Sequence, residues 1–163
     1  MAVFRWALVA LSILVISGCA SKFRTYNGPE VTKILVFKEQ RQMVLMHHDS
    51  VLRRYDFELG FTPAGDKKIS GDGKTPEGDY FIDRKNPNSA FHLSLGISYP
   101  NAQDIAEAKA LGKSPGGDIF IHGTPNRFNQ TQDWTWGCIA VTNREMEDIY
   151  AMVDIGTPIS IYP

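Results

Sequence analysis

Two residues in the C-terminal half of the chain, His122 and Cys138, are of the types that carry out acyl transfer through a thioester. His122 ends a predicted strand, and Cys138 lies sixteen positions further on, just before a predicted helix. A nearby imidazole and a helix start would both lower the thiol pKa from about 8.5 into the range of about 3.5 to 7.5. Gly137 would let the backbone approach closely, so the amides of Gly137 and Cys138 could form an oxyanion hole.

The same two residues also have simpler interpretations. Free cysteine is among the residue types most often buried, and a histidine at a strand end is often only hydrogen-bonded. A zinc site is a third option, with His92 and Asp118 as further ligands, but structural zinc sites use three or four ligands at short spacing. The residues alone leave these alternatives open.

The N-terminus suggests an exported protein. An apolar run from Trp6 to Ser17 follows Arg5 and is too short for a bilayer span, which needs about 20 residues. Its length fits the apolar region of a signal peptide. The run ends in Ile16-Ser17-Gly18-Cys19, which resembles the bacterial lipobox, where small residues precede the cysteine that receives the lipid. A plain signal peptide, or a buried helix with an incidental cysteine, is the alternative.

The lipobox resemblance also bears on Cys138, because the chain contains only two cysteines. If Cys19 carries a lipid, Cys138 has no intramolecular disulfide partner. A lone thiol in an envelope compartment is exposed to oxidation, which favours a reactive role for Cys138.

The rest of the chain predicts one domain that is mainly β with one or two short helices. Its 163 residues, 43% hydrophobic content and 21% charged content are ordinary for a single globular domain. A formal net charge of -1 and the lack of long basic runs argue against a nucleic-acid partner. Short runs of β-forming residues separated by polar turns indicate a β-meander near the start. The predicted strands are 32–38, 42–48, 51–59, 78–84, 118–122 and 157–163, and the predicted helices are 104–112 and 142–156. Thr142 or Asn143 is expected to cap the second helix.

Four segments, in order, resemble the L,D-transpeptidase family (YkuD-like catalytic domain). The His-Gly pair at 122–123 and "TWGCIAV" at 135–141 resemble the catalytic signature. "SGDGKTPEGDYFI" at 70–82 is similar to a Gly-rich, Thr-Pro-x-Gly segment that precedes it. "SYPNAQD" at 98–104 resembles the branch that includes YafK-like proteins, and "GTPISIYP" at 156–163 closes the chain in a family-like way. The resemblance covers about residues 32–163.

This resemblance implies a YkuD-like β-sandwich or meander (α+β) over residues 32–163, after a lipoprotein signal peptide (1–18) and a lipidated Cys19 with its tether (19–31). It implies Cys138 as nucleophile, His122 as base and acid, and Gly137 in the oxyanion hole. The expected substrate-binding residues are Trp136, Gly123, Thr135, His92 and Tyr99. Thr75, Pro76 and Gly78 are expected to frame the site rather than react, and Trp134 to stack on substrate or act as a lid or core residue.

The implied activity is peptidoglycan L,D-transpeptidation, with no metal or organic cofactor. The expected partners are peptidoglycan stem peptides, the membrane through the N-terminal lipid, and possible wall-attached lipoprotein acceptors. The expected location is the cell envelope, on the outer membrane and facing the periplasm. A cysteine hydrolase of the same family, or a non-catalytic wall-binding lipoprotein, is the alternative.

The chain departs from the family pattern at two positions. Trp136 stands where a histidine is usual, and the resemblance assigns that residue's backbone carbonyl to orienting the catalytic imidazole. Ala140 stands where an arginine is frequent, which leaves the contact to substrate open. Arg127 or Arg144 is a candidate replacement for that arginine.

Overall fold

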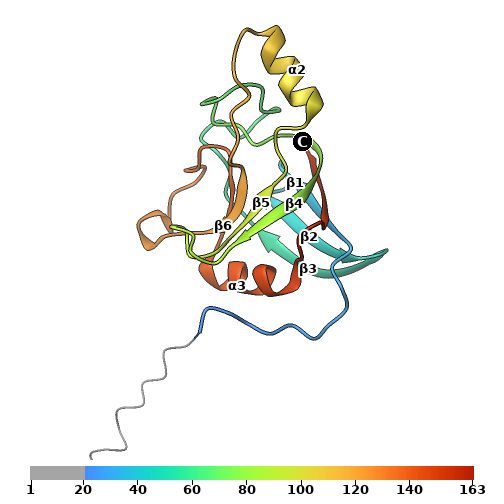
Figure 1. Cartoon of the computed structure of the whole chain (residues 1–163). Coiled ribbons are helices and arrows are strands. Elements are labelled where there is room, and N and C mark those ends of the chain that lie inside the picture. The colour runs from blue at the N-terminus through green and yellow to red at the C-terminus, as the bar shows by residue number, and fades with distance from the viewer. Residues whose placement is uncertain (1–20) are drawn as a thin grey trace, which may run out of the picture.

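The computed structural model describes residues 21–163, so the predicted signal peptide and Cys19 lie outside the described residues. Eight strands, two α-helices and one short 3-10 helix follow one another along this part of the chain (Figure 1). The strands are β1 (Lys33–Phe37), β2 (Gln42–His47), β3 (Ser50–Asp56), β4 (Gly78–Asn86), β5 (Ser94–Ile97), β6 (Phe120–Gly123), β7 (Ile139–Val141) and β8 (Pro158–Tyr162). The helices are α2 (Ala102–Ala110), η1 (Asn126–Phe128) and α3 (Asn143–Met152).

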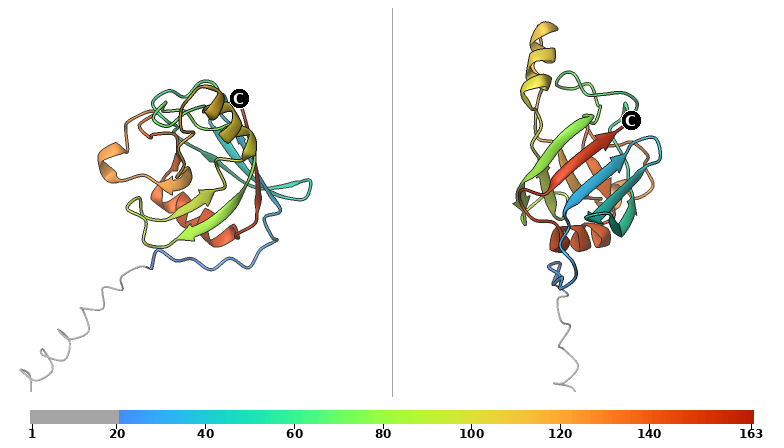
Figure 2. Two further views of the ribbon diagram at one scale, coloured as in Figure 1. Left: turned by 45° about the horizontal axis from the view of Figure 1, so that its top comes forward. Right: turned by 90° about the vertical axis from the view of Figure 1, so that its right-hand side faces the viewer.

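The strands form one sheet in the order β3-β2-β1-β8-β4-β5-β6-β7, which bends into a near-barrel (Figure 2). β1, β2 and β3 pair as an antiparallel meander, as predicted. Parallel pairs join β1 to β8 and β6 to β7. The chain after β3 reaches the opposite edge of the sheet, where Glu58 and Ala140 exchange two backbone hydrogen bonds of 2.8 and 2.9 Å. This bridge brings the two edges of the sheet together.

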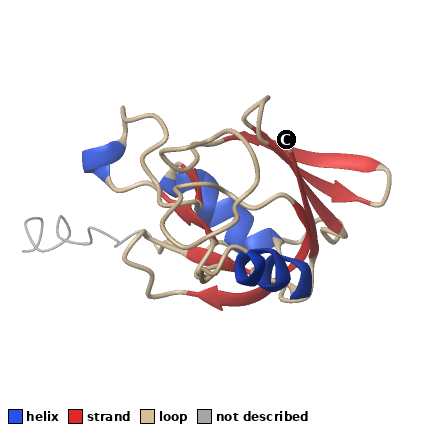
Figure 3. Ribbon diagram, turned by 90° about the horizontal axis from the view of Figure 1, so that it is seen from above, coloured by secondary structure: helices blue, strands red, loops and turns tan. Residues whose placement is uncertain are grey.

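Helix α3 lies at one end of the curved sheet (Figure 1) and packs against β5 and β6; in the view from above it lies behind the loops (Figure 3). Thr142 caps it as predicted: its side chain accepts from the Glu145 amide, and the Glu145 side chain accepts from the Thr142 amide. The buried face of α3 is formed by Met146, Ile149 and Met152, which join the core of the sheet. The cap fixes where α3 begins, and this in turn fixes the end of β7.

Helix α2 projects away from the sheet at the end opposite α3 (Figure 1). Asn101 caps it in a capping box with Asp104, whose buried carboxylate also accepts from the Tyr80 hydroxyl at 3.0 Å. Asp104 therefore has a structural role, linking α2 to strand β4.

The sequence prediction differs from the structure in two strands. β5 and β7 were not predicted because they contain only four and three residues and carry a Gly or Ala where β-formers are usual. The short β7 lies between Cys138 and α3, where the sequence predicted no element, while α3 itself begins at Asn143, within one residue of its predicted start.

The segment before β1 lies along the domain and passes close to α3 (Figure 1). Arg24 forms ion pairs with Glu147 and Asp148 of α3 at 2.7 and 2.6 Å. Lys22 donates to the carbonyl oxygens of Pro87 and His92. In residues 21–163, no helix has the length and apolar content needed to cross a membrane.

Candidate active site

His122 lies on β6, and Cys138 lies directly before the neighbouring parallel strand β7, on the same face of the sheet. The β6–β7 register pairs Ile121 with Ile139 and His122 with Ala140, so Phe120 lies beside Cys138 one step earlier. The backbone of Phe120 acts on the thiol and lowers its pKa, which agrees with this position. Side chains alternate along a strand, so Phe120 and His122 project from the same face of the sheet. Strand spacing and the rise per residue place the Cα atoms of Cys138 and His122 at a separation of about 8 Å. The imidazole and the thiol are thus diagonal neighbours.

The imidazole of His122 is held in one orientation and one tautomer. Its Nδ1 lies 2.8 Å from the carbonyl oxygen of Gly123. A carbonyl only accepts, so Nδ1 carries the proton and Nε2 is left as the basic nitrogen. The ring stacks on Phe91 at 4.5 Å between centroids and packs against Trp134 at 5.5 Å. In the structure the carbonyl of Gly123 has the orienting role that the resemblance assigned to the carbonyl of Trp136.

The backbone around the thiol is braced by two buried threonines. Thr75 is fully buried and donates its hydroxyl to the carbonyl of Gly137 at 2.9 Å. Thr135 donates to the carbonyl of Cys138 at 2.8 Å. Gly137 has a φ of 120°, and a Cβ there would collide with the carbonyl oxygen of Lys74. The Thr-Pro-x-Gly segment therefore frames the cysteine loop, as expected from the sequence.

Thr135 also binds one of the two backbone amides that were predicted to stabilise the oxyanion. The Gly137 amide donates to the Thr135 hydroxyl at 3.2 Å, so it is already partnered in this structure. Thr135 thus accepts from one side of the loop and donates to the other.

The pKa shifts of Cys138 and His122 do not favour the thiolate that the sequence predicted. Burial raises the pKa of the Cys138 thiol to about 11, and the carboxylate of Asp118 acts in the same direction. The thiol lies 3.6 Å from the carbonyl oxygen of Asp118. Burial also lowers the pKa of His122. The resting site therefore holds a neutral thiol beside a neutral imidazole, and the prediction of a lowered thiol pKa was wrong for this state.

The structure separates the predicted substrate-binding residues into exposed and internal ones. Trp136 is 73% exposed and packs edge-on against Phe61, so its indole is open to a ligand. Thr135 and Gly123 are buried and brace the site. Tyr99 is buried with its hydroxyl on the carbonyl of Pro115, and the ring of His92 contacts Glu147 of α3 at 2.9 Å.

Trp134 lies in the wall behind the imidazole. It stacks on Phe128 at 4.2 Å with nearly parallel rings, in addition to its contact with His122. Of the two roles that the sequence left open for Trp134, the structure shows the lid or core role. Phe91, on the other side of the imidazole, was not identified from the sequence, because an isolated phenylalanine in a loop gives no pattern.

Neither arginine proposed to replace the missing family arginine lies at the thiol. The guanidinium of Arg127 lies over Phe128 on η1, and Arg144 is exposed on α3. Ala140 is buried opposite Glu58 and lines a cavity of about 650 Å³.

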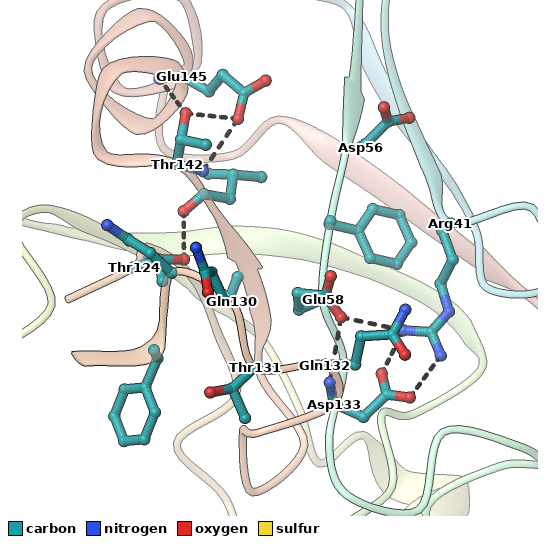
Figure 4. Close-up of a pocket in the computed structure, with 15 residues that line it drawn as sticks. Arg41, Asp56, Glu58, Thr124, Gln130, Thr131, Gln132, Asp133, Thr142 and Glu145 are labelled. Carbon is teal, nitrogen blue, oxygen red and sulfur yellow. Dashed lines mark hydrogen bonds and ion pairs between the residues drawn. The ribbon is translucent and has the colours of Figure 1, made fainter. Parts of the chain in front are cut away.

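This cavity lies beside the site and is acidic (Figure 4). The loop 124–133 and the ends of β3 and β7 form its walls. Its four carboxylates come from Asp56, Glu58, Asp133 and Glu145, and its one cation is Arg41, which is paired with Asp133 at 2.8 Å. Neither Cys138 nor His122 lines it, but Ala140 and Thr124 do, and these follow the two site residues closely in sequence.

Metal ligation finds no support in the described part of the chain. Within residues 21–163 no group of three or more His, Cys, Asp or Glu side chains is placed to hold an ion. The Asp118 side chain is 88% exposed and pairs with Arg84, and His92 is engaged by α3.

Comparison with known proteins identifies the family. The family described as YkuD, the L,D-transpeptidase catalytic domain, matches residues 32–161. YafK of Escherichia coli (strain K12) is 30% identical over 143 residues, which cover 80% of this chain and 53% of YafK. The chain thus spans about half the length of this curated relative.

Solved structures agree with this result. The helical cell shape determining protein Pgp2 from Campylobacter jejuni is similar with a TM-score of 0.63 and 28% identity, over 88% of this chain and 51% of Pgp2. Bd1075 from Bdellovibrio bacteriovorus gives a TM-score of 0.59 and 27% identity, over 82% of this chain and 48% of Bd1075. An L,D-transpeptidase from Mycobacterium smegmatis shares the fold at a TM-score of 0.55 and 14% identity, over 82% of this chain and 59% of that one. The chain, whose candidate site combines His122 of β6 with Cys138 directly before β7, belongs to the YkuD family of L,D-transpeptidase catalytic domains.

Proposed function

We propose that this chain is a peptidoglycan L,D-transpeptidase that uses Cys138 as nucleophile. The observation that carries the proposal is the fixed, neutral imidazole of His122, whose Nε2 is basic and whose ring lies on the face of the sheet that carries the thiol. Family membership supplies the reaction type, and the donor substrate is a tetrapeptide stem that contains diaminopimelate.

The first half of the reaction forms a thioester. Sγ of Cys138 attacks the carbonyl carbon at the L-centre of diaminopimelate while the thiol proton passes to Nε2 of His122. Backbone amides near Gly137 and Cys138 stabilise the oxyanion; the Gly137 amide must then exchange its bond to Thr135 for one to the oxyanion. The C–N bond to D-Ala breaks, and the leaving amine takes the proton from the imidazolium.

The pKa directions favour a coupled proton transfer over a preformed thiolate. A thiol with a raised pKa stays protonated at neutral pH, and an imidazole with a lowered pKa stays available as a base. Attack and proton transfer then occur together, and the charged pair forms only in the transition state. His122 returns the proton to the leaving group, which needs no solvent proton.

The second half transfers the acyl group to an amine. The acceptor is the side-chain amine of a neighbouring stem, which gives a 3-3 cross-link, or the lysine of a wall-attached lipoprotein. The acidic cavity beside the site supports a cationic acceptor, because its walls carry four carboxylates against one guanidinium. Pairing with a carboxylate would hold the ammonium until it loses its proton at the site.

Hydrolysis of the same thioester is the second candidate. Water would replace the amine and give an L,D-carboxypeptidase, or an amidase that releases wall-bound protein. The observation that favours it is Ala140, which leaves no arginine where the family frequently has one. A non-catalytic wall-binding lipoprotein is the remaining candidate, and it requires neither Cys138 nor His122.

Purified muropeptides separate these candidates by product mass. Incubation with the wild type is expected to give dimers with loss of D-Ala, and the Cys138→Ala variant is expected to give none. Shortened monomers or freed protein would instead indicate the hydrolase. Equal products from wild type and variant would remove the nucleophile from the proposal.

We further propose that the chain is anchored in the cell envelope by a lipid on Cys19, on the outer membrane facing the periplasm. The support is the sequence before Cys19 alone: an apolar run of signal-peptide length and small residues next to the cysteine. Several acyl chains are needed for stable anchoring, and bacterial lipoprotein modification supplies them.

A further inference from the structure

A row of four paired positions crosses the sheet and ends at the nucleophile. Arg84 of β4 pairs with Gly96 of β5, and Gly96 pairs with Phe120 of β6. Continuing the β6–β7 register by one residue places Phe120 beside Cys138. Side chains at directly paired positions project from the same face, so this row runs across the face that carries the thiol.

Gly96 lets the Arg84 side chain reach along this row. A Cβ at position 96 would lie 2.4 Å from Oδ1 of Asp83, and 2.6 Å from Cγ and 3.0 Å from Cζ of Arg84, so any larger residue would displace both side chains. The guanidinium passes over Gly96 and lies 4.5 Å above the ring of Phe120. Arg84 is therefore the arginine that the structure directs toward the cysteine, in contrast to Arg127 and Arg144.

Asp118 completes a charged pair at the end of the row. Its carboxylate accepts from Nη2 of Arg84 at 3.1 Å, while Nη1 of Arg84 donates to Asp83 at 2.8 Å. The backbone carbonyl of Asp118 lies 3.6 Å from the Cys138 thiol. Asp118 has a φ of 56°, a left-handed conformation that is uncommon outside glycine and that turns its carbonyl to the thiol. One residue thus contacts both the nucleophile and the arginine.

The pair is open to a ligand. The side chains of Arg84 and Asp118 are 44% and 88% exposed. An ion pair this exposed contributes little to stability, so a ligand that offers matching charges can open it at little cost. Because the Asp118 carbonyl contacts the thiol, the Arg84–Asp118 pair belongs to the surface around Cys138.

We propose that Arg84 and Asp118 form the subsite for the zwitterionic end of the diaminopimelate side chain. This end carries a carboxylate and an ammonium on one carbon, about 6 Å from the reacting carbonyl by bond lengths. The guanidinium exchanges its bonds to Asp83 and Asp118 for two parallel hydrogen bonds to the substrate carboxylate, and the freed Asp118 carboxylate accepts from the ammonium. The inference rests on the proposed function and adds the part of the substrate that the enzyme recognises.

The test compares three stems: the free tetrapeptide, one with an amide on the side-chain carboxylate of diaminopimelate, and one with an amide on the terminal D-Ala. Affinity is measured by calorimetry on the Cys138→Ala variant, which cannot react, and kcat/KM on proteins that keep Cys138. In the Cys138→Ala background Arg84→Gln is expected to weaken binding of the free stem by roughly 10- to 100-fold and to leave the side-chain amide unchanged. The matched control is Arg53→Gln on β3, an exposed arginine at the far edge of the sheet.

Each outcome bears on one proposal. If Arg84→Gln weakens all three stems equally, or if the loss follows the D-Ala carboxylate, the assignment to the side-chain end is overturned. Arg84→Lys is expected to recover part of the discrimination, since it restores charge without the paired hydrogen bonds. Binding that depends on Arg84 without turnover by the wild type would refute the transferase and support the subsite. Turnover by the wild type that is unchanged in Arg84→Gln would support the transferase and refute the subsite.

Discussion

The hydrogen bond from Thr75 to the Gly137 carbonyl is the link between two sequence motifs, and Thr75→Val tests it. Valine keeps the shape of threonine and removes the hydroxyl, so the Gly137 carbonyl loses the 2.9 Å bond in a fully buried position. An unsatisfied buried acceptor costs about 1 to 3 kcal/mol. For a domain of this size that lowers Tm by roughly 4 to 10 °C.

The functional effect of Thr75→Val should exceed its effect on stability. Gly137 directly precedes the nucleophile, and Thr75 is one of the two side chains that hold this part of the loop. We expect kcat to fall at least roughly tenfold at a temperature where the variant is fully folded, because small displacements of reacting groups are costly. Calorimetry and a muropeptide assay measure the two effects. Thr25→Val, which alters an exposed threonine outside the cavity with no side-chain hydrogen bond among the described residues, is the control. Unchanged Tm and kcat in Thr75→Val would refute the bracing role.

Four further predictions address the backbone, the protonation states and the anchor. Gly137→Ala should lower the free energy of unfolding in urea by about 3 kcal/mol or more. The control Gly112→Ala, also at positive φ but in open space, should lower it by about 1 kcal/mol. Equal losses in the two variants would contradict the close approach of Gly137 to Lys74. Without substrate, iodoacetamide should alkylate Cys138 at pH 7 at least roughly tenfold slower than free cysteine, because burial raises its pKa to about 11; an equal or faster rate would indicate a preformed thiolate. Since burial lowers the pKa of His122 below its usual 6.5, the acid side of the kcat/KM profile should have its midpoint below pH 6.5. The unfolded chain takes up this proton first, so the stability from a neutral His122 should also decline below pH 6.5, and a midpoint above 6.5 would refute the assignment. Cys19→Ser should move the protein from the membrane to the soluble fraction on fractionation, and retention in the membrane would contradict the lipid anchor.

Local sequence patterns predicted most of the elements that position the site. Polar turns between β-forming runs gave β1, β2 and β3, and a threonine three residues before a glutamate gave the start of α3. β5 and β7 were missed because strands this short are stabilised by their neighbours and not by their own residues. α3 begins where it was predicted, but a short strand precedes it, so the thiol lies directly before β7.

Residue types identified the reacting pair, but not what surrounds it. Phe91 and the carbonyl of Gly123 orient the imidazole, and neither gives a sequence signal, because one is an isolated aromatic and the other is backbone. The raised thiol pKa depends on burial, which single-residue reasoning cannot supply. The row from Arg84 to Cys138 depends on the register of four strands, and this register exists only in the folded sheet.

The most direct test of the central claim is to trap the acyl-enzyme. The wild type is incubated with a tetrapeptide stem, quenched in acid, and analysed by intact mass and peptide mapping. We expect an adduct equal to the stem minus D-Ala, located on Cys138, absent from Cys138→Ala and strongly reduced in His122→Gln. Product formation with no adduct on Cys138, or an adduct that persists in Cys138→Ala, would contradict the account.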